Sequence, residues 1–529
     1  MIIRLLLLFI VFPVLASDNY PRNEAVDITR YIFRIELNDT TNRIGGMATI
    51  RFYSRKAIQE LEVDLAGDAS GKGMQVEEVR LQGRLIIFNH HNNRLKMLFP
   101  VQIPQGQESE ITIRYAGIPA DGLIISRNRY GERTFFGDNW PDRARHWLPC
   151  IDHPYDKAAV EFIVIAPPHY QVVANGIRTE ESYLTNRQKL THWREDVPLP
   201  TKVMVIGVSR FAIRLLGMVN HIPVEAWVYP QNRDEGFSDY APAVKVLRFF
   251  DSLLAPYPYR KLANVQSTTR YGGMENANTI FYFENSVSGK GQVEGLIAHE
   301  IAHQWFGNSA SEGDWHHVWL SEGFATYFTH VYMEHTYGLE RRKELMKRDR
   351  NRVIDHCAKM PAPVIDTHIT HFPDLLSPHV YERASWVLHM LRRQVGDSAF
   401  FAGIRLYYKT FSFGNARTED FRKIMETTSG QNLETFFRQW LYEIPIPRLR
   451  ISWQYQNGKV DINISQVQPE PAFYITLEAG LTFSDGEERI EKLVITRKNQ
   501  TFSLPVPSRP VRITPDPGVN LLFEEVKGY

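Results

Sequence analysis

The sequence predicts a multidomain α+β protein: a β-sandwich or saddle-shaped β domain, a mainly helical middle domain and a small C-terminal β-sandwich. The chain has 529 residues, 43% of them hydrophobic and 23% charged, which suits about two to four globular domains. Apolar residues alternate with period two from residue 19 to about residue 211, and longer amphipathic segments follow up to about residue 443. This change of period divides the chain.

The N-terminal β domain is expected over residues 17–211. Residues 31–37, 48–52 and 111–115 alternate between apolar and polar side chains, and glycine-rich turns separate such runs. Residues 203–208 read as a last buried strand. Strands of this kind predict a sandwich or a saddle-shaped sheet.

The middle domain is expected over residues 212–444, and its amphipathic segments predict helices. These segments are residues 243–254, 293–306, 322–337, 339–354, 384–395 and 433–442. Pro445 and Pro447 then end the helical pattern, because proline does not suit a helix interior. Beyond them, short alternating runs joined by Asn-Gly and Asp-Gly turns predict a β-sandwich over residues 445–529.

The first sixteen residues have the pattern of a signal peptide. Arg4 supplies a positive start, residues 5–15 are apolar, and the small residues around Ala16 suit cleavage after it. No other stretch has the roughly 18 apolar residues that a membrane helix needs. We therefore expect an exported protein, periplasmic or secreted, without an integral membrane span after cleavage; the alternative is an uncleaved anchor.

The net charge bears on possible partners, and the cysteine content bears on metal binding and disulfide formation. The formal net charge is +1, so there is no electrostatic case for a nucleic-acid partner. Cys150 and Cys357 are the two cysteines, and their spacing makes no metal or redox motif. They are either free and buried or joined in a disulfide, which export would permit.

One stretch of the sequence contains the candidate metal-binding and catalytic residues. His299-Glu300-Ile301-Ala302-His303 is an H-E-x-x-H motif, which should occur by chance only about 0.04 times in a chain with 18 histidines. On a helix, His299 and His303 lie on one face, one turn apart, as two ligands of one metal must. Glu300 lies about 100° around the helix, where a general base for a metal-bound water belongs.

Glu322 follows as the third ligand, on a second expected helix for which Ser321 is available as a cap. Two histidines and one carboxylate leave a fourth position open, which is typical of a catalytic zinc site. Upstream, Tyr271-Gly272-Gly273-Met274-Glu275-Asn276 forms a second cluster. Its glycine pair lets the backbone approach a ligand closely, and Glu275 could receive a cationic group. Alone, such a pair is more often just a turn.

Together the two motifs resemble peptidase family M1, the zinc aminopeptidases of the aminopeptidase N and leukotriene hydrolase type, which belong to the gluzincins. The family combines a G-x-M-E-N loop with H-E-x-x-H and a glutamate 18 residues later. Further matches are Arg145, Cys150, Asp152, Lys157, Asn175-Gly176, Trp319-Leu320 and Tyr381 in Val380-Tyr381-Glu382-Arg383-Ala384. The resemblance covers residues 20–445.

The resemblance implies a thermolysin-like catalytic domain with one Zn²⁺ on His299, His303 and Glu322. It implies that the zinc activates a water molecule, that Glu300 is the general base, and that Tyr381 donates a hydrogen bond to the oxyanion. Peptide substrates with a free N-terminus are implied. The substrate-binding residues would be Tyr271, Gly272, Gly273, Met274, Glu275 and Asn276, with Glu275 pairing with the α-ammonium group.

The sequence also departs from the family. Many relatives hold the α-amine with a further Gln or Glu in the first domain; here the corresponding segment offers only Asp138 or Asn139 as a substitute. Alternatives to an aminopeptidase are a related zinc hydrolase, such as an endopeptidase or an epoxide hydrolase, and a catalytically silent peptide-binding protein. Residue preference and oligomeric state are not encoded in these motifs.

Overall fold

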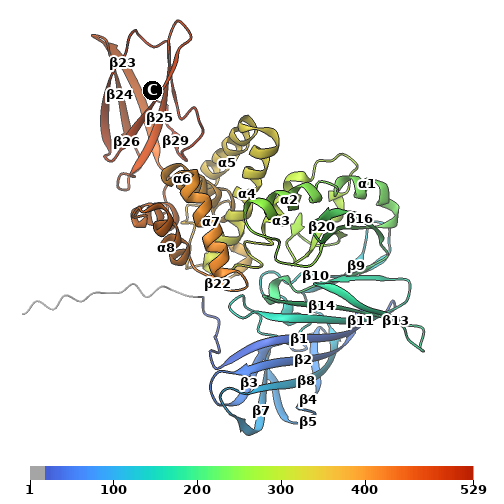
Figure 1. Ribbon diagram of the computed structural model, residues 1–529. Coiled ribbons are helices and arrows are strands. Elements are labelled where there is room, and N and C mark those ends of the chain that lie inside the picture. The colour runs from blue at the N-terminus through green and yellow to red at the C-terminus, as the bar shows by residue number, and fades with distance from the viewer. Residues whose placement is uncertain (1–17, 528–529) are drawn as a thin grey trace, which may run out of the picture.

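The structure is a computed structural model that describes residues 18–527, so the expected signal peptide lies outside the described residues. Three parts follow one another (Figure 1): β-sheets at the N-terminal end, helices around a sheet in the middle, and a small β domain on the far side of the helices. None of the helices within residues 18–527 is both long and apolar enough to cross a membrane. The predicted multidomain α+β architecture is confirmed.

The N-terminal part is built on an eight-stranded sheet with the order β13-β14-β11-β1-β2-β8-β4-β5. Its strands are β13 (Ile177–Tyr183), β14 (Lys189–Leu199), β11 (Ala158–Ala166), β1 (Val26–Glu36), β2 (Ile44–Ser54), β8 (Glu108–Ile118), β4 (Gly73–Leu81) and β5 (Arg84–Leu85). In β1, Tyr31, Phe33 and Ile35 are buried while their neighbours are at least partly exposed. The period-two alternation therefore places one face of the strand in the core.

Two smaller sheets complete this part. One has the order β12-β15-β10-β9 and the other β3-β7-β6. Their strands are β12 (Gln171–Ala174), β15 (Ile206–Ser209), β10 (Arg133–Gly137), β9 (Leu123–Arg127), β3 (Ile58–Asp64), β7 (Arg94–Ile103) and β6 (Ile87–His91). The last buried strand begins later than the sequence predicts, because a 3-10 turn over Thr201–Val203 precedes it.

The middle domain begins with a five-stranded sheet in the order β16-β17-β18-β20-β19. Its strands are β16 (Ala212–Val219), β17 (Ile222–Val228), β18 (Leu262–Ser267), β20 (Thr279–Phe283) and β19 (Gly273–Met274). Strands β17, β18 and β20 are parallel, and β18 is buried along its whole length. The short strand β19 forms the edge of the sheet, antiparallel to β20, and carries the predicted glycine loop.

Helices pack against this sheet and against one another. They are α1 (Arg233–Asp239), α2 (Ala243–Leu253), α3 (Glu294–Ala302), α4 (Trp319–Tyr337), α5 (Leu339–Lys359), α6 (Ala384–Val395), α7 (Asp397–Phe411), α8 (Thr418–Ser429) and α9 (Glu434–Phe437). The predicted segment 433–442 divides into α9 and a π-helical turn at Arg438–Tyr442. The sequence did not indicate α7, whose aromatic residues have weak helix propensity and are buried by packing.

The C-terminal domain is the predicted β-sandwich. One sheet has the order β27-β24-β23-β29 and the other β26-β25-β28. The strands are β27 (Asn499–Pro505), β24 (Lys459–Gln466), β23 (Arg448–Gln456), β29 (Glu524–Glu525), β26 (Glu488–Ile495), β25 (Ile475–Thr482) and β28 (Arg512–Pro515). Asn457 and Gly458 both have positive φ, 52° and 74°, as a two-residue hairpin turn of type I′ requires.

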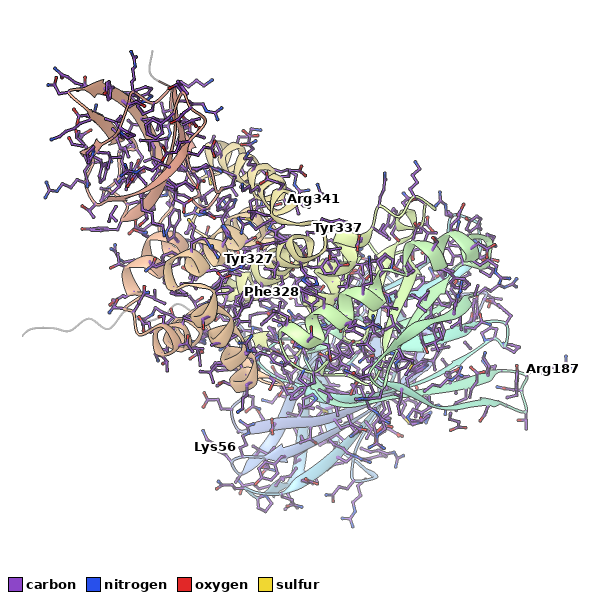
Figure 2. All side chains as sticks on the ribbon, turned by 45° about the horizontal axis from the view of Figure 1, so that its top comes forward. Lys56, Arg187, Tyr327, Phe328, Tyr337 and Arg341 are labelled. Carbon is purple, nitrogen blue, oxygen red and sulfur yellow. The ribbon has the colours of Figure 1, made fainter. Side chains whose placement is uncertain are left out.

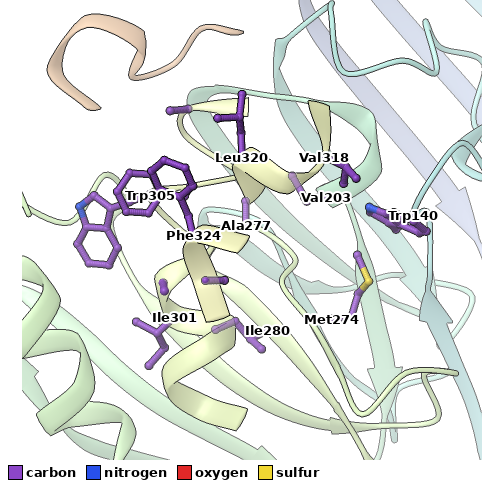
Figure 3. Packing of buried hydrophobic residues seen from close by; sticks show 14 of the residues in the cluster. Trp140, Val203, Met274, Ala277, Ile280, Ile301, Trp305, Val318, Leu320 and Phe324 are labelled. Atoms are coloured by element: carbon purple, nitrogen blue, oxygen red, sulfur yellow. The ribbon is translucent and has the colours of Figure 1, made fainter. Parts of the chain in front are cut away.

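The apolar core continues across the boundary between the N-terminal part and the middle domain. Figure 3 shows Trp140 and Val203 from the former beside Met274, Ala277 and Ile280 from the latter. This packing fixes the N-terminal part against the edge of the sheet that carries the glycine loop. The two cysteines are both free; Cys150 is buried and Cys357 is half-buried.

Candidate metal and peptide site

Three side chains from α3 and α4 converge on one point. His299 lies in the last turn of α3, and His303 is the residue that ends that helix with helical backbone angles. The Nε2 atoms of His299 and His303 lie 3.0 Å apart. Oε2 of Glu322, from α4, lies 3.4 Å from Nε2 of His299 and 3.2 Å from Nε2 of His303.

These distances fit a metal ion. Donor atoms about 2.0–2.1 Å from a tetrahedral zinc lie about 3.3 Å from one another, close to the three separations just given. Oε2 of Glu322 is buried and has no hydrogen-bond partner among the described residues, so the cluster has a place for a cation. Within residues 18–527 it is the one group of three or more His, Cys, Asp or Glu side chains close enough to share an ion.

Neighbouring groups orient His303. Its Nδ1 lies 3.1 Å from the carbonyl oxygen of Phe306 and 3.1 Å from Oγ of Ser321. With Nδ1 donating to that carbonyl, Nε2 keeps its lone pair for the metal. The prediction that Ser321 caps α4 is wrong: α4 begins at Trp319, because the 3-10 turn Trp315–His317, capped by Asp314, leads directly into it. Ser321 instead contacts the ring of His303.

The charges within the cluster are coupled. Burial lowers the pKa of His299, which favours the neutral imidazole. Burial also opposes protonation of His303, but the carboxylate of Glu322 outweighs it and raises the pKa of His303 to about 9. A metal ion would compete with that proton for Nε2.

Glu300 lies beside the ligands and against the glycine loop. It is 4% exposed, and burial raises the pKa of its carboxyl group well above the ordinary value. A Cβ atom on Gly273 would overlap the carboxylate of Glu300, so a larger residue there would require the Glu300 side chain to move. Gly272, in contrast, faces open space.

The loop after β19 places Glu275 at the site with one carboxyl oxygen unpartnered. Its backbone carbonyl accepts hydrogen bonds from Nε2 of Gln304, at 2.9 Å, and Nδ2 of Asn308, at 2.6 Å. The side chain is 5% exposed, and its Oε1 has no hydrogen-bond partner among the described residues. Burial raises the pKa of this carboxyl group, and His303 and Lys202 oppose that rise only in part. A cation placed against Oε1 would stabilise the charged form.

Tyr381 closes the other side of the ligand cluster. It lies in a π-helical turn, His379–Arg383, that leads into α6, and such turns occur often at functional sites. Its ring stacks on that of His299, with centroids 6.0 Å apart. Burial and then the carboxylates of Glu322, Glu275 and Glu300 raise the pKa of the phenol well above its ordinary value, so it remains a hydrogen-bond donor.

A small cavity of about 60 Å³ joins these groups. The predicted site residues that line it are Tyr271, Gly273, Met274, Glu275, His299, Glu300, His303, Glu322 and Tyr381. Asn276 does not line it; its buried amide has no partner among the described residues. Sequence reasoning missed two further lining residues, Trp140 and Leu376, for which no local motif exists.

The first-domain substitutes for an amine anchor, Asp138 and Asn139, do not reach the cavity. Asp138 pairs with Arg143. Asn139 donates to the carbonyl oxygens of Thr201 and Met204 and accepts from Nε1 of Trp147. Both side chains are therefore used within the fold, and the neighbouring Trp140 lines the cavity in their place.

The fold and donor set define a metallopeptidase-like site, and comparisons with known proteins agree. The Peptidase M1 N-terminal domain model matches residues 28–203, and the Peptidase family M1 domain model matches residues 239–440. Together the two matches cover well over half of the sequence. The chain belongs to peptidase family M1.

Relatives and solved structures extend this result. The chain is similar to rat glutamyl aminopeptidase, at 27% identity over 60% of this chain and 35% of the relative. It is also similar to rat aminopeptidase N, at 24% identity over 79% and 46%. It thus spans less than half the length of these curated relatives. An M1 zinc metallopeptidase crystal structure from Deinococcus radiodurans has the same fold, with a TM-score of 0.69 and 23% identity over 80% of this chain and 95% of that one.

Proposed function

We propose that the protein is a zinc-dependent aminopeptidase that removes the N-terminal residue from peptides. The observation that carries the proposal is the pairing of two features in one cavity. His299, His303 and Glu322 form a donor set for a catalytic zinc ion, and the unpartnered carboxylate of Glu275 faces the same space. The first feature suits hydrolysis, and the second suits a substrate that brings a cation.

When bound, the zinc ion would supply a Lewis acid that polarises the scissile carbonyl and acidifies water. Glu300 would accept a proton from the attacking water at its carboxylate and later pass it to the departing amine. Tyr381 would donate its phenolic hydrogen to the carbonyl oxygen as negative charge develops there. The missing Cβ of Gly273 leaves room for the Glu300 side chain, and the backbone of Gly272 and Gly273 would position the substrate.

Recognition of the α-ammonium group would make the enzyme an exopeptidase. A buried carboxylate without a partner is unfavourable, and a substrate ammonium group relieves it. A peptide with a blocked N-terminus brings no cation and leaves Glu275 unsatisfied. Hydrogen bonds from Gln304 and Asn308 to the Glu275 carbonyl hold the loop, so the carboxylate is already in place before substrate arrives.

The cavity walls favour an apolar N-terminal residue. Trp140, Tyr271, Met274 and Leu376 contribute aromatic and aliphatic surface, and no Lys or Arg of the described chain lines the cavity to receive an acidic side chain. A variant of the Deinococcus radiodurans enzyme was solved with a Tyr-Ser-Ala substrate, with a TM-score of 0.67 and 21% identity over 80% of this chain and 96% of that one. In this chain, an aromatic N-terminal residue would lie against the aromatic and aliphatic wall of the cavity.

The test is cleavage of aminoacyl-arylamides, free and N-acetylated, with and without a zinc chelator. We expect cleavage of the free amines only, and loss of that cleavage with chelator. Equal cleavage of blocked substrates would contradict the role of Glu275 and favour an endopeptidase. Zinc bound in the absence of any cleavage would contradict the proposed activity and favour an epoxide hydrolase or a peptide-binding protein.

We also propose that the protein is exported, periplasmic or secreted. The support is the sequence pattern alone: a positive start, an apolar run and small residues around Ala16. N-terminal sequencing of the protein from fractionated cells is expected to begin at Ser17. Recovery of the intact Met1 end from the cell interior would contradict export.

A further inference from the structure

A large groove opens from the small cavity. The groove has a volume of about 1120 Å³, against about 60 Å³ for the cavity. The two share five residues: Tyr271, Gly273, His299, Glu300 and Tyr381. Continuity at these residues means that one extended ligand can occupy both spaces.

The shared residues give the ligand a direction. Glu275, which receives the amine under the proposed function, lines the cavity but not the groove. The general base Glu300 and the oxyanion donor Tyr381 line both. The scissile bond therefore lies at the junction, the N-terminal residue lies in the cavity, and everything after the bond points into the groove.

Helices α4 and α5 build the far walls. Thr326, Thr329 and Met333 of α4 line the groove at helical spacing, one above another on the same face. Tyr337 and Arg341, where α4 ends and α5 begins, continue that wall (Figure 2). The groove thus runs away from the ligand cluster along two packed helices.

Three arginines of α5 follow the groove. Arg341, Arg348 and Arg352 all line it, and spacings of 7 and 11 residues place them within about 40° of one another on the helix. They extend over about 16 Å, the length of roughly five residues of extended peptide. Arg341 pairs with Glu344 at 3.0 Å, and both side chains are exposed, so this surface pair is weak and can be exchanged. Arg348 and Arg352 pair with the buried carboxylates of Asp349 and Glu382, at 3.0 and 2.7 Å.

We propose that this groove binds the residues that follow the scissile bond, so that the enzyme acts on peptides of several residues in preference to dipeptides. The inference rests on the proposed function and names its substrate class. The occupant is an extended peptide of mixed composition, because both signs of charge, hydroxyl groups and apolar side chains line the groove. Binding energy from these remote residues raises kcat/KM.

A length series tests the proposal. Leucine is followed by an arylamide, or by one, two, five or nine uncharged Gly and Ser residues, and kcat/KM is measured for each. We expect an increase of at least about fivefold from the dipeptide to the decapeptide. Rates that do not depend on peptide length would contradict the proposal that the groove binds the residues after the scissile bond. Failure to cleave the arylamide would instead contradict the proposed aminopeptidase function.

Two variants localise the effect. Thr329→Trp fills the groove and is expected to lower kcat/KM for the decapeptide about tenfold more than for the arylamide. Thr410→Trp is the matched control: Thr329 and Thr410 each donate to the carbonyl four residues earlier, but Thr410 lies on α7 outside the groove. Equal losses on both substrates with Thr329→Trp would contradict the proposal.

The second variant is Arg348→Ala, at a side chain that is 69% exposed but pairs with the buried Asp349 at 3.0 Å, so its unfolding is measured alongside its activity. We expect a two- to threefold loss for the decapeptide, about 0.5 kcal/mol of binding, and a smaller loss for the arylamide. A decapeptide rate equal to that of the native protein with both Arg348→Ala and Thr329→Trp would overturn the assignment of this groove.

Discussion

The two β-rich ends of the chain meet the middle domain in different ways. The N-terminal part contributes Trp140 to the cavity wall and places the buried Lys202 against the buried Glu312 of the middle domain. The C-terminal sandwich contributes none of the described residues that line the cavity or the groove. It contacts α5 and α6, through Asp516 with Arg350 at 3.2 Å and Asn520 with His389 at 3.1 Å.

The N-terminal part thus belongs to the candidate site, whereas the C-terminal sandwich supports it from outside. Lys157 of the N-terminal part donates to the carbonyl oxygens of Asn308 and Ser309, at 3.2 and 2.8 Å. Asn308 in turn donates to the Glu275 carbonyl. The N-terminal part therefore lies two contacts from the residue that would receive the amine, whereas the C-terminal sandwich holds the helices behind the groove.

The largest expected effect comes from breaking the N-terminal contact. Lys202→Met leaves Glu312, which is fully buried, without its cation and should destabilise the protein by about 3–5 kcal/mol. Urea unfolding and arylamide cleavage would both show it. The matched control is Lys245→Met, which removes a 59% exposed lysine from its pair with Glu294 and should change stability by at most about 1 kcal/mol. Equal stability of the two variants would contradict the claim that the buried Lys202–Glu312 pair fixes the N-terminal part to the middle domain.

The contact between the C-terminal sandwich and α5, through Asp516 and Arg350, should instead make the free energy of unfolding depend on pH. Burial raises the pKa of Asp516 to about 6, against the lowering effect of Arg350 and with Glu478 raising it further. The fold therefore favours the protonated carboxyl group. That stabilisation is complete below about pH 4 and is lost as pH rises to about 6, a change of about 3 kcal/mol.

Asp516→Asn checks this prediction. Unfolding measured between pH 4 and pH 7 should have a smaller pH slope for the variant than for the native protein, whatever the absolute stability. At pH 7 its kcat/KM for a leucyl arylamide should equal that of the native protein, because Asp516 lies outside the site. An unchanged slope would contradict the burial argument, and lost cleavage would contradict the description of this domain as a support.

The smallest expected effect is a change in substrate preference, which tests whether the N-terminal part helps to select the N-terminal residue of the substrate. Trp140→Phe enlarges the cavity and should raise kcat/KM for a phenylalanyl arylamide relative to an alanyl arylamide by about fivefold. Trp227→Phe is the control, because Trp227 is also buried but lies on β17 and does not line the cavity. An unchanged ratio with Trp140→Phe would remove Trp140 from the specificity pocket.

Local spacing was enough to predict the ligand cluster. His299, His303 and Glu322 lie on two consecutive helices, and the periodicity of a helix brings the two histidines together without further information. The glycine loop could be predicted as a place of close approach, and the structure supplies the reason in the overlap that a Cβ on Gly273 would make with Glu300. The fold class followed from hydrophobic periods of two and 3.6 residues.

Contacts over long sequence separations could not be predicted in this way. Trp140 reaches the cavity because the N-terminal part packs against the middle domain, and Asp138 turns away because Arg143 takes its charge. Helix α7 has weak intrinsic propensity and forms by burying Phe400, Ile404 and Tyr407. Asn276 matches the family motif, yet its side chain lies outside the cavity.

The central claim is that His299, His303 and Glu322 hold a catalytic zinc ion while Glu300 moves the proton. Metal analysis and arylamide turnover of Glu300→Gln test it most directly, with His303→Ala as the comparison that should lose metal. We expect Glu300→Gln to keep one zinc ion per chain and to lose turnover by a factor of about 10²–10⁴. Native turnover, or loss of the metal from Glu300→Gln, would contradict the account.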